Sequence, residues 1–140
     1  MIIQKRLLFL CITLLTFTSF TTFQGNYVGE WQKKGTGEIS FLTLSPDGFA
    51  TLQIGRKIIG GRAYNYQGVK CAMKYKINKG TFPTAIDLIA TEVRSGREIT
   101  RLKGIVKMNS PNEMQIELVL GGVSRPTSFS SKAVLLKRTR

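Results

Sequence analysis

The sequence predicts an all-β fold: an antiparallel up-and-down barrel of about eight strands. Apolar and polar residues alternate with a period of two along most of residues 25–140, and no segment carries a convincing 3.6-residue apolar stripe. Turn-forming residues separate the alternating segments at hairpin spacing. A chain of 140 residues suits one domain. We favour a barrel over a sandwich because closure removes the exposed edges of a sheet.

The clearest alternation lies in residues 70–77 and 113–120. In the first segment Cys71, Met73 and Tyr75 face one side, and mostly lysines face the other. This pattern is typical of strands that are buried on one face. Shorter segments complete the expected set of strands, at 27–33, 38–44, 49–54, 62–66, 85–91, 98–108 and 132–137.

Turns are expected at 45–48, 78–80, 94–96 and 109–112. Each of these segments contains Gly, Pro, Asn or Asp, which tight turns favour for their backbone angles and local hydrogen bonds. The glycine pairs at 60–61 and 121–122 indicate sharper breaks or bulges.

Residues 1–24 have the pattern of an export signal that precedes a barrel domain at 25–140. Lys5 and Arg6 come before an apolar stretch at 7–15 (LLFLCITLL), and an uncharged segment rich in Thr and Ser follows. A membrane-spanning helix needs about 20 mostly apolar residues, so the Thr and Ser content weakens the alternative of an uncleaved anchor. We therefore expect an exported protein, periplasmic or extracellular.

The composition argues against catalysis. The chain has no His, which excludes Ser-His and Cys-His nucleophile pairs and every His-dependent metal site. Its carboxylates define no pair across a cleft, and Ca²⁺-binding and phosphate-binding loop motifs are absent. Cys71, the one cysteine after the signal, is expected to be a small buried residue, with a reactive thiol or an intermolecular bridge as the alternative. We expect no enzymatic activity, metal or cofactor.

The net charge is +13, from 21 basic and 8 acidic residues. A solvated exterior is the ordinary explanation of such charge, and contact with anionic envelope lipids or glycans is the alternative. Sparse aromatic residues among the basic ones, together with export, argue against nucleic acid as a partner. The expected basic outer face comprises Lys70, Lys74, Lys76, Arg97, Arg101, Lys103 and Lys107.

Five sequence blocks carry a family resemblance: Gly29-Glu30-Trp31, 83–88 (PTAIDL), Gly104-Ile105, 125–129 (RPTSF) and 134–138 (VLLKR). In this order they resemble a family of small bacterial extracytoplasmic domains of unknown function, best known from planctomycetes, with a lipocalin-like barrel. The resemblance implies that barrel and supplies no activity.

Lipocalin-like barrels place a Gly-x-Trp on the first strand and cover the Trp with an Arg from late in the chain. The resemblance therefore implies that Arg125 or Arg138 lies over Trp31, in a cation–π contact that plugs the closed end of the barrel. The expected structural motif comprises Gly29, Trp31, Arg125, Pro126 and Phe129.

Two functions stay open at this point. In the first, the inner faces of the strands form a pocket that carries an apolar small molecule. In the second, the same residues fill the barrel, and the basic outer face contacts anionic envelope components. High salt would weaken only the second kind of binding. The pocket candidates are Cys71, Met73, Tyr75, Ile86, Leu88, Met114, Ile116 and Leu118.

Overall fold

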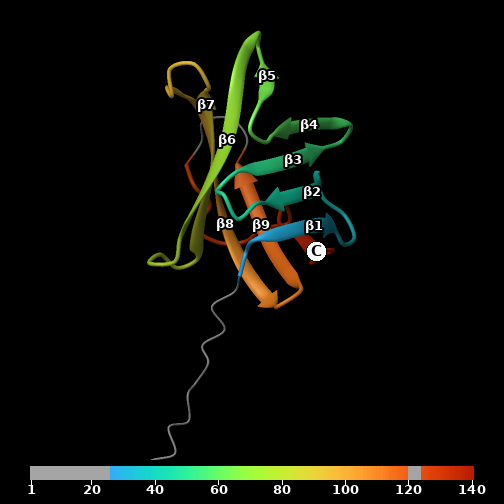
Figure 1. Ribbon diagram of the computed structural model, residues 1–140. Coiled ribbons are helices and arrows are strands. Elements are labelled where there is room, and N and C mark those ends of the chain that lie inside the picture. The colour runs from blue at the N-terminus through green and yellow to red at the C-terminus, as the bar shows by residue number, and fades with distance from the viewer. Residues whose placement is uncertain (1–25, 120–123) are drawn as a thin grey trace, which may run out of the picture.

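Ten antiparallel strands form one sheet that curls into a nearly closed barrel (Figure 1). The computed structural model describes residues 26–119 and 124–140, so the expected signal at 1–24 lies outside the described residues. The predicted all-β antiparallel barrel is confirmed, and the expected count of about eight strands was too low. The strands are β1 (Gly29–Lys33), β2 (Ile39–Leu44), β3 (Ala50–Ile54), β4 (Lys57–Gly60), β5 (Tyr64–Tyr66), β6 (Val69–Asn78), β7 (Thr84–Glu92), β8 (Glu98–Ser110), β9 (Glu113–Val119) and β10 (Val134–Arg138).

The strand order is a meander that joins the two ends of the chain. From β5 to β10 each strand pairs with the next one, β10 then pairs with β1, and the order continues from β1 to β4. Trp31 lies opposite Arg138 in the β1–β10 ladder. The break in the barrel therefore falls between β4 and β5, within the chain rather than between its ends.

Every segment predicted to be a strand contains one, and β4 is the strand that the sequence did not predict. It has four residues, Lys57–Gly60, which is too short for alternation to be visible. It pairs with β3 in a tight hairpin, where Ile54 lies opposite Lys57 and Thr51 lies opposite Gly60.

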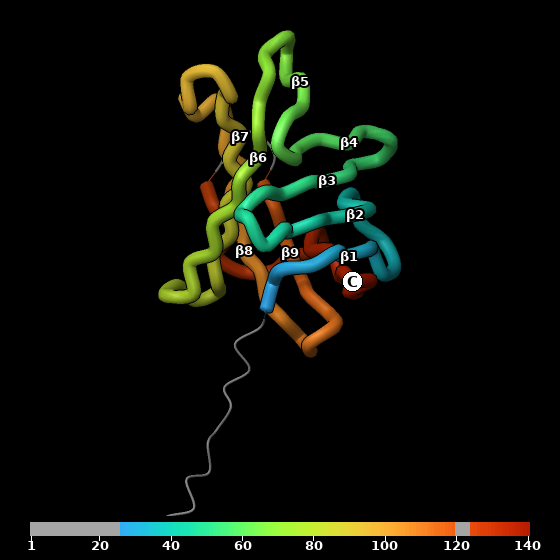
Figure 2. Tube along the Cα trace, in the orientation of Figure 1, coloured from blue at the N-terminus to red at the C-terminus, as the bar shows by residue number. Residues whose placement is uncertain are grey.

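A glycine corner directs the chain from β4 to β5 (Figure 2). Gly60 and Gly61 have φ of +109° and +81°, a region that favours glycine. A Cβ on Gly60 would lie 2.3 Å from the carbonyl oxygen of Ala50. The Gly61 amide donates to the Ala50 carbonyl (2.7 Å), and the Gly61 carbonyl accepts from the Met73 amide (2.9 Å). The corner thus ties β3 and β4 to β6 across part of the break.

The core fills the barrel from its centre to its lower end, where the described chain begins. Strands β1–β4 run across the view of Figure 1 while β6–β8 run up it, so side chains from the two groups meet inside. Burying each large apolar side chain contributes roughly 1.5–3 kcal/mol to folding. The fully buried core residues include Trp31, Leu42, Leu44, Leu52, Met114, Ile116 and Leu136.

Segment 124–133 crosses the outer face of β7, β8 and β9, and we call it the outer segment. Ile105 and Glu117 lie on that face by strand alternation, yet they are only 1 % and 7 % exposed. The Glu117 carboxylate accepts hydrogen bonds from the amide and the hydroxyl of Ser130, both 2.8 Å. Glu117 is therefore buried although it lies on the outer face of the sheet, because the outer segment covers it.

Replacement of Gly60 tests the corner. Gly60→Ala places a methyl group against the Ala50 carbonyl and also strains the backbone, so we expect a loss of more than about 2 kcal/mol in the free energy of unfolding. Gly35→Ala is the matched control, because Gly35 has φ of +86° with nothing within 4 Å of an added Cβ. Equal losses in urea denaturation would contradict the close approach at Gly60.

Candidate functional site

Trp31 and Arg138 close the lower end of the barrel. The Trp31 side chain is fully buried, and its indole N–H donates to the Tyr27 carbonyl at 3.0 Å. The Arg138 guanidinium carbon lies 4.3 Å from the centroid of the Trp31 ring. Of the two arginines expected over Trp31, it is therefore Arg138 that covers the ring, and Arg125 lies elsewhere.

Arg138 also ties the beginning of the described chain to the β8–β9 turn. Its guanidinium donates to the carbonyls of Asn26 and Val28, and its Nε donates to the carbonyl of Pro111 at 3.0 Å. Gly29 leaves room for this group, since a Cβ there would lie 2.5 Å from Arg138 Nη1. The guanidinium of Arg138 thus donates its hydrogen bonds to backbone carbonyls, which gives this residue a structural role.

Arg125 forms a second cluster, on the outer face of β7 and β8. Its Nη2 donates to Asp87 Oδ1 (2.7 Å), and its Nη1 donates to the carbonyls of Ile86 (3.1 Å) and Gly104 (2.8 Å). Arg101 Nη1 donates to the other oxygen of Asp87 at 2.9 Å. Asp87 therefore bridges two arginines and fastens the outer segment to the barrel.

The five sequence blocks come together as these two clusters. Blocks 29–31 and 134–138 meet at the closed end, and blocks 83–88, 104–105 and 125–129 meet around Asp87. Of the expected structural motif, Gly29 and Trp31 belong to the closed end, whereas Arg125, Pro126 and Phe129 belong to the outer segment.

A cavity of about 280 Å³ opens at the upper end of the barrel, at the break between β4 and β5, and we call it the mouth cavity. Its wall is mostly apolar. Burial, with added contributions from Cys71 and Tyr66, raises the pKa of Tyr64 to about 12, so this hydroxyl stays neutral at physiological pH. The lining residues are Ile54, Lys57, Ile59, Tyr64, Tyr66, Met73, Leu88, Thr100 and Leu102.

Two of the eight pocket candidates, Met73 and Leu88, line the mouth cavity. Cys71 is buried as a free thiol. Tyr75 is half-buried, and its hydroxyl donates to the Ser45 carbonyl at 2.8 Å, which ties β6 to the β2–β3 turn.

The remaining pocket candidates lie elsewhere. Ile86, Met114 and Ile116 are fully buried in the packed core, where they fill space. Leu118 lines a different cleft, of about 270 Å³, between β2 and residues 131–134. The interior is thus filled over most of its length and open near one end.

The sequence analysis missed most of the cavity wall. Tyr64 and Tyr66 alternate with Asn65, and Thr100 and Leu102 lie on the inner side of β8, so the period-two pattern could have identified these four residues. Ile59 could not be identified in this way, because β4 is too short for alternation to be visible.

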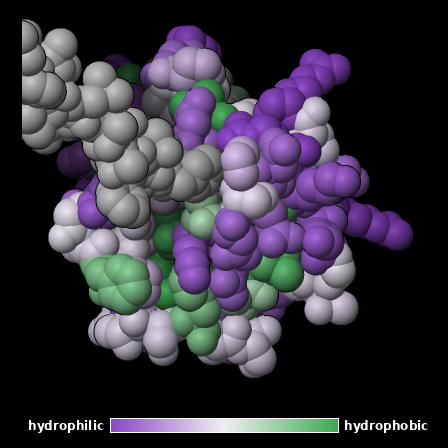
Figure 3. Space-filling model, turned by 90° about the horizontal axis from the view of Figure 1, so that it is seen from below, coloured by the Kyte–Doolittle hydropathy of each residue, from purple (hydrophilic) through white to green (hydrophobic). Residues whose placement is uncertain are grey.

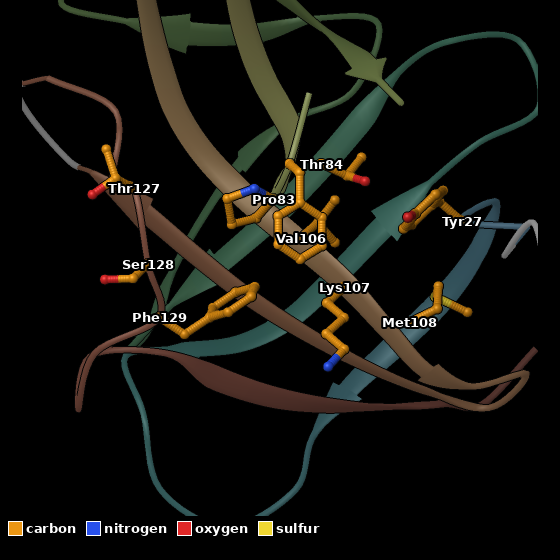
Figure 4. A pocket seen from close by; sticks show the side chains of 10 residues that line it. Tyr27, Pro83, Thr84, Val106, Lys107, Met108, Thr127, Ser128 and Phe129 are labelled. Atoms are coloured by element: carbon orange, nitrogen blue, oxygen red, sulfur yellow. The ribbon is translucent and has the colours of Figure 1, made fainter. Parts of the chain in front are cut away.

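A second cleft, of about 460 Å³, lies at the lower end of the barrel, and we call it the lower cleft. Figure 4 shows Tyr27 and Met108 on one side and Phe129 on the other, with Val106 and Lys107 between them. From below, apolar side chains are visible in a hollow beside strongly polar ones (Figure 3). The lining residues are Tyr27, Phe82, Pro83, Thr84, Val106, Lys107, Met108, Thr127, Ser128 and Phe129.

The basic outer face is exposed with one exception. Arg101 is half-buried, and besides its bond to Asp87 it donates two hydrogen bonds to Glu98, at 2.7 and 3.3 Å. Arg101 therefore lies on the outer face with its charge paired to Asp87 and Glu98. The exposed members are Lys70, Lys74, Lys76, Arg97, Lys103 and Lys107.

Within residues 26–119 and 124–140, no three potential metal-ligating side chains gather in one place. The same residues contain no helix of the length and apolarity needed to cross a membrane. Comparison of the chain with protein-family models, curated proteins and solved structures finds no match.

Truncation of Trp31 tests the closed end. We expect Trp31→Ala to lower the free energy of unfolding by about 3–5 kcal/mol, because it empties a fully buried site and leaves Arg138 without its ring. Trp31→Phe keeps a ring for Arg138 and should cost less. Thermal unfolding followed by far-ultraviolet circular dichroism measures both, and an unchanged melting temperature for Trp31→Ala would remove the assignment.

Replacement of Asp87 tests the outer cluster. Asp87→Asn removes the charge between two arginines, so we expect a loss of about 1–3 kcal/mol and faster amide hydrogen exchange in the outer segment. Glu98→Gln is the matched control: it weakens a more exposed partner of Arg101, and we expect it to cost less than about 1 kcal/mol. Unchanged exchange throughout residues 124–133 in Asp87→Asn would show that Asp87 does not fasten the segment.

Proposed function

We propose that this protein is an exported, lipocalin-like binding module that holds a small apolar molecule in the mouth cavity. The observation that carries the proposal is the open space inside the upper end of the barrel, which inward-facing apolar side chains surround. Around Trp31 the interior is filled and covered by Arg138, and the lower cleft lies between the exposed Phe82 and the outer segment.

The chemistry of the wall defines the class of ligand. Binding pockets are mostly apolar with a few polar groups that orient the ligand, and here Ile54, Met73 and Leu102 form apolar wall while Thr100 and Lys57 supply polar groups. About 280 Å³ accommodates roughly 10–15 non-hydrogen atoms. A ligand with an apolar body and a polar or acidic end fits this lining.

The lining favours binding over catalysis. It contains no carboxylate and no thiol, and its only ionisable groups are Lys57, Tyr64 and Tyr66. A hydrolytic reaction needs a paired acid and base or an activated nucleophile. Export, expected from residues 1–24, and the resemblance to small extracytoplasmic domains both suit a carrier.

The proposal can be tested by filling the cavity with a larger side chain and measuring the affinity for 1-aminoanthracene, a neutral apolar fluorophore of suitable size. Leu102→Trp places an indole in the mouth cavity, so we expect it to weaken binding of the probe at least about ten-fold, since most of the apolar contact area is lost. Val93→Trp is the matched control, because Val93 is exposed (47 %) and is not part of the cavity wall. Far-ultraviolet circular dichroism must show both variants folded.

Salt and native mass spectrometry separate the carrier from the alternative. Binding in the cavity should be insensitive to ionic strength, whereas contacts of the basic outer face with anionic components should weaken sharply. A stoichiometric small adduct that is lost on denaturation would identify the natural ligand by mass. Equal affinity of the parent and Leu102→Trp for the probe, or no binding by either, would overturn the proposal.

A further inference from the structure

Phe82 is the most exposed large apolar side chain among the described residues. It lies in the β6–β7 turn, which is held by its own hydrogen bonds: the Gly80 amide donates to Asn78 Oδ1 (2.9 Å), and the Ala85 amide donates to the Thr81 hydroxyl (3.0 Å). An ordered turn therefore presents a phenyl ring to solvent. An exposed apolar group of this kind marks an interaction site when further apolar surface adjoins it.

Such surface adjoins Phe82 in the lower cleft. Phe82 and Phe129 both line the cleft, and its floor includes the inward-facing residues Val106 and Met108. The cleft extends past β7, because the β7–β8 ladder ends at the pair Thr84–Val106 while β8 continues to Ser110. Phe82 is thus the fully exposed member of the residues that line the lower cleft.

Two lysines flank this surface. Lys107 lines the cleft, and Lys79 Nζ lies 5.7 Å from the centroid of the Tyr27 ring, which also lines it. Neither lysine forms an ion pair with any residue that the structure describes. Glu113, in the strand beside β8, is already paired with Lys34 at 2.9 Å. Aromatic rings between lysines suit the lipid–water interface, where the ring enters the headgroup region and the cations meet phosphates.

The lower end is also the end of the barrel at which the described chain begins, because Arg138 holds Asn26 there. Strands β4 and β5, which contribute to the wall of the mouth cavity, lie toward the opposite end (Figure 1), so contact with a membrane at the lower end leaves the cavity accessible.

We propose that the lower end of the barrel docks on an anionic membrane, with Phe82 entering the headgroup region and Lys79 and Lys107 meeting lipid phosphates. This surface is separate from the mouth cavity and does not depend on a ligand there.

The test places a tryptophan at each end of the full chain. Phe82→Trp puts a fluorophore in the proposed anchor, and Val93→Trp puts one in the β7–β8 turn at the opposite end of the barrel (Figure 1). Trp31, present in both, is fully buried and serves as the background in the parent chain. Each protein is mixed with vesicles of phosphatidylcholine and brominated phosphatidylglycerol, because the bromine atoms quench only a tryptophan that enters the bilayer interface.

We expect blue-shifted and quenched emission for Phe82→Trp and neither change for Val93→Trp. Adding Lys79→Gln or Lys107→Gln to Phe82→Trp should weaken the vesicle affinity about five-fold per lysine. Vesicles made only of brominated phosphatidylcholine, which carry no net charge, should give no quenching. Lys70→Gln, at the opposite end, is the matched control and should change nothing.

Three outcomes would overturn the proposal. Equal quenching at positions 82 and 93 would show that the barrel has no preferred orientation on the membrane. No quenching at either position would show that the lower end stays in water even where residues 1–24 bind the vesicle. A blue shift of Phe82→Trp that depends on protein concentration without vesicles would assign this surface to a second copy of the chain.

Discussion

The pairing of β10 with β1 is the constraint on which the rest of the structure depends. It joins the two ends of the described chain through a ladder, with further bonds from the Glu30 amide to the Arg140 carbonyl (2.9 Å) and from the Thr139 amide to the Glu30 carbonyl (2.8 Å). The same register places Arg138 against Trp31. Because the closing contact of the meander lies here, the discontinuity of the barrel falls between β4 and β5, and the position of the mouth cavity follows.

The two arginine clusters have different structural roles, although each is built around one guanidinium group. Arg138 uses its planar guanidinium to cover a ring and to satisfy backbone carbonyls at the closed end. Arg125 uses the same group to attach a segment without regular structure to a sheet that would otherwise face water, with Asp87 as its counterion. Lysine could replace neither, because both sites need several donors in one plane.

The period-two pattern predicted the class of fold and nine of the ten strands, because burial of one face is a local property of each strand. It could not predict β4, whose four residues depend on pairing with β3. It could not choose between Arg125 and Arg138, since the choice rests on Asp87, which lies 38 residues from Arg125 in the chain. The pocket candidates came from the strands with the most regular alternation, and in a barrel those strands supply the packed centre. Whether a cavity remains inside depends on how side chains from opposing strands meet, and the sequence of a single strand does not contain that information.

The break between β4 and β5 is also the place where the interior of the barrel opens to solvent. β4 has four residues and one partner strand, β3, so the free energy of opening it is a small part of the free energy of unfolding the whole barrel. Under the proposed carrier function, a ligand would enter and leave the mouth cavity by local opening of this short strand about its glycine corner. The residence time of a bound molecule would then respond to substitution of Ile58, the exposed residue of β4 that neither lines the cavity nor forms the corner, while the affinity of the cavity wall stays almost unchanged.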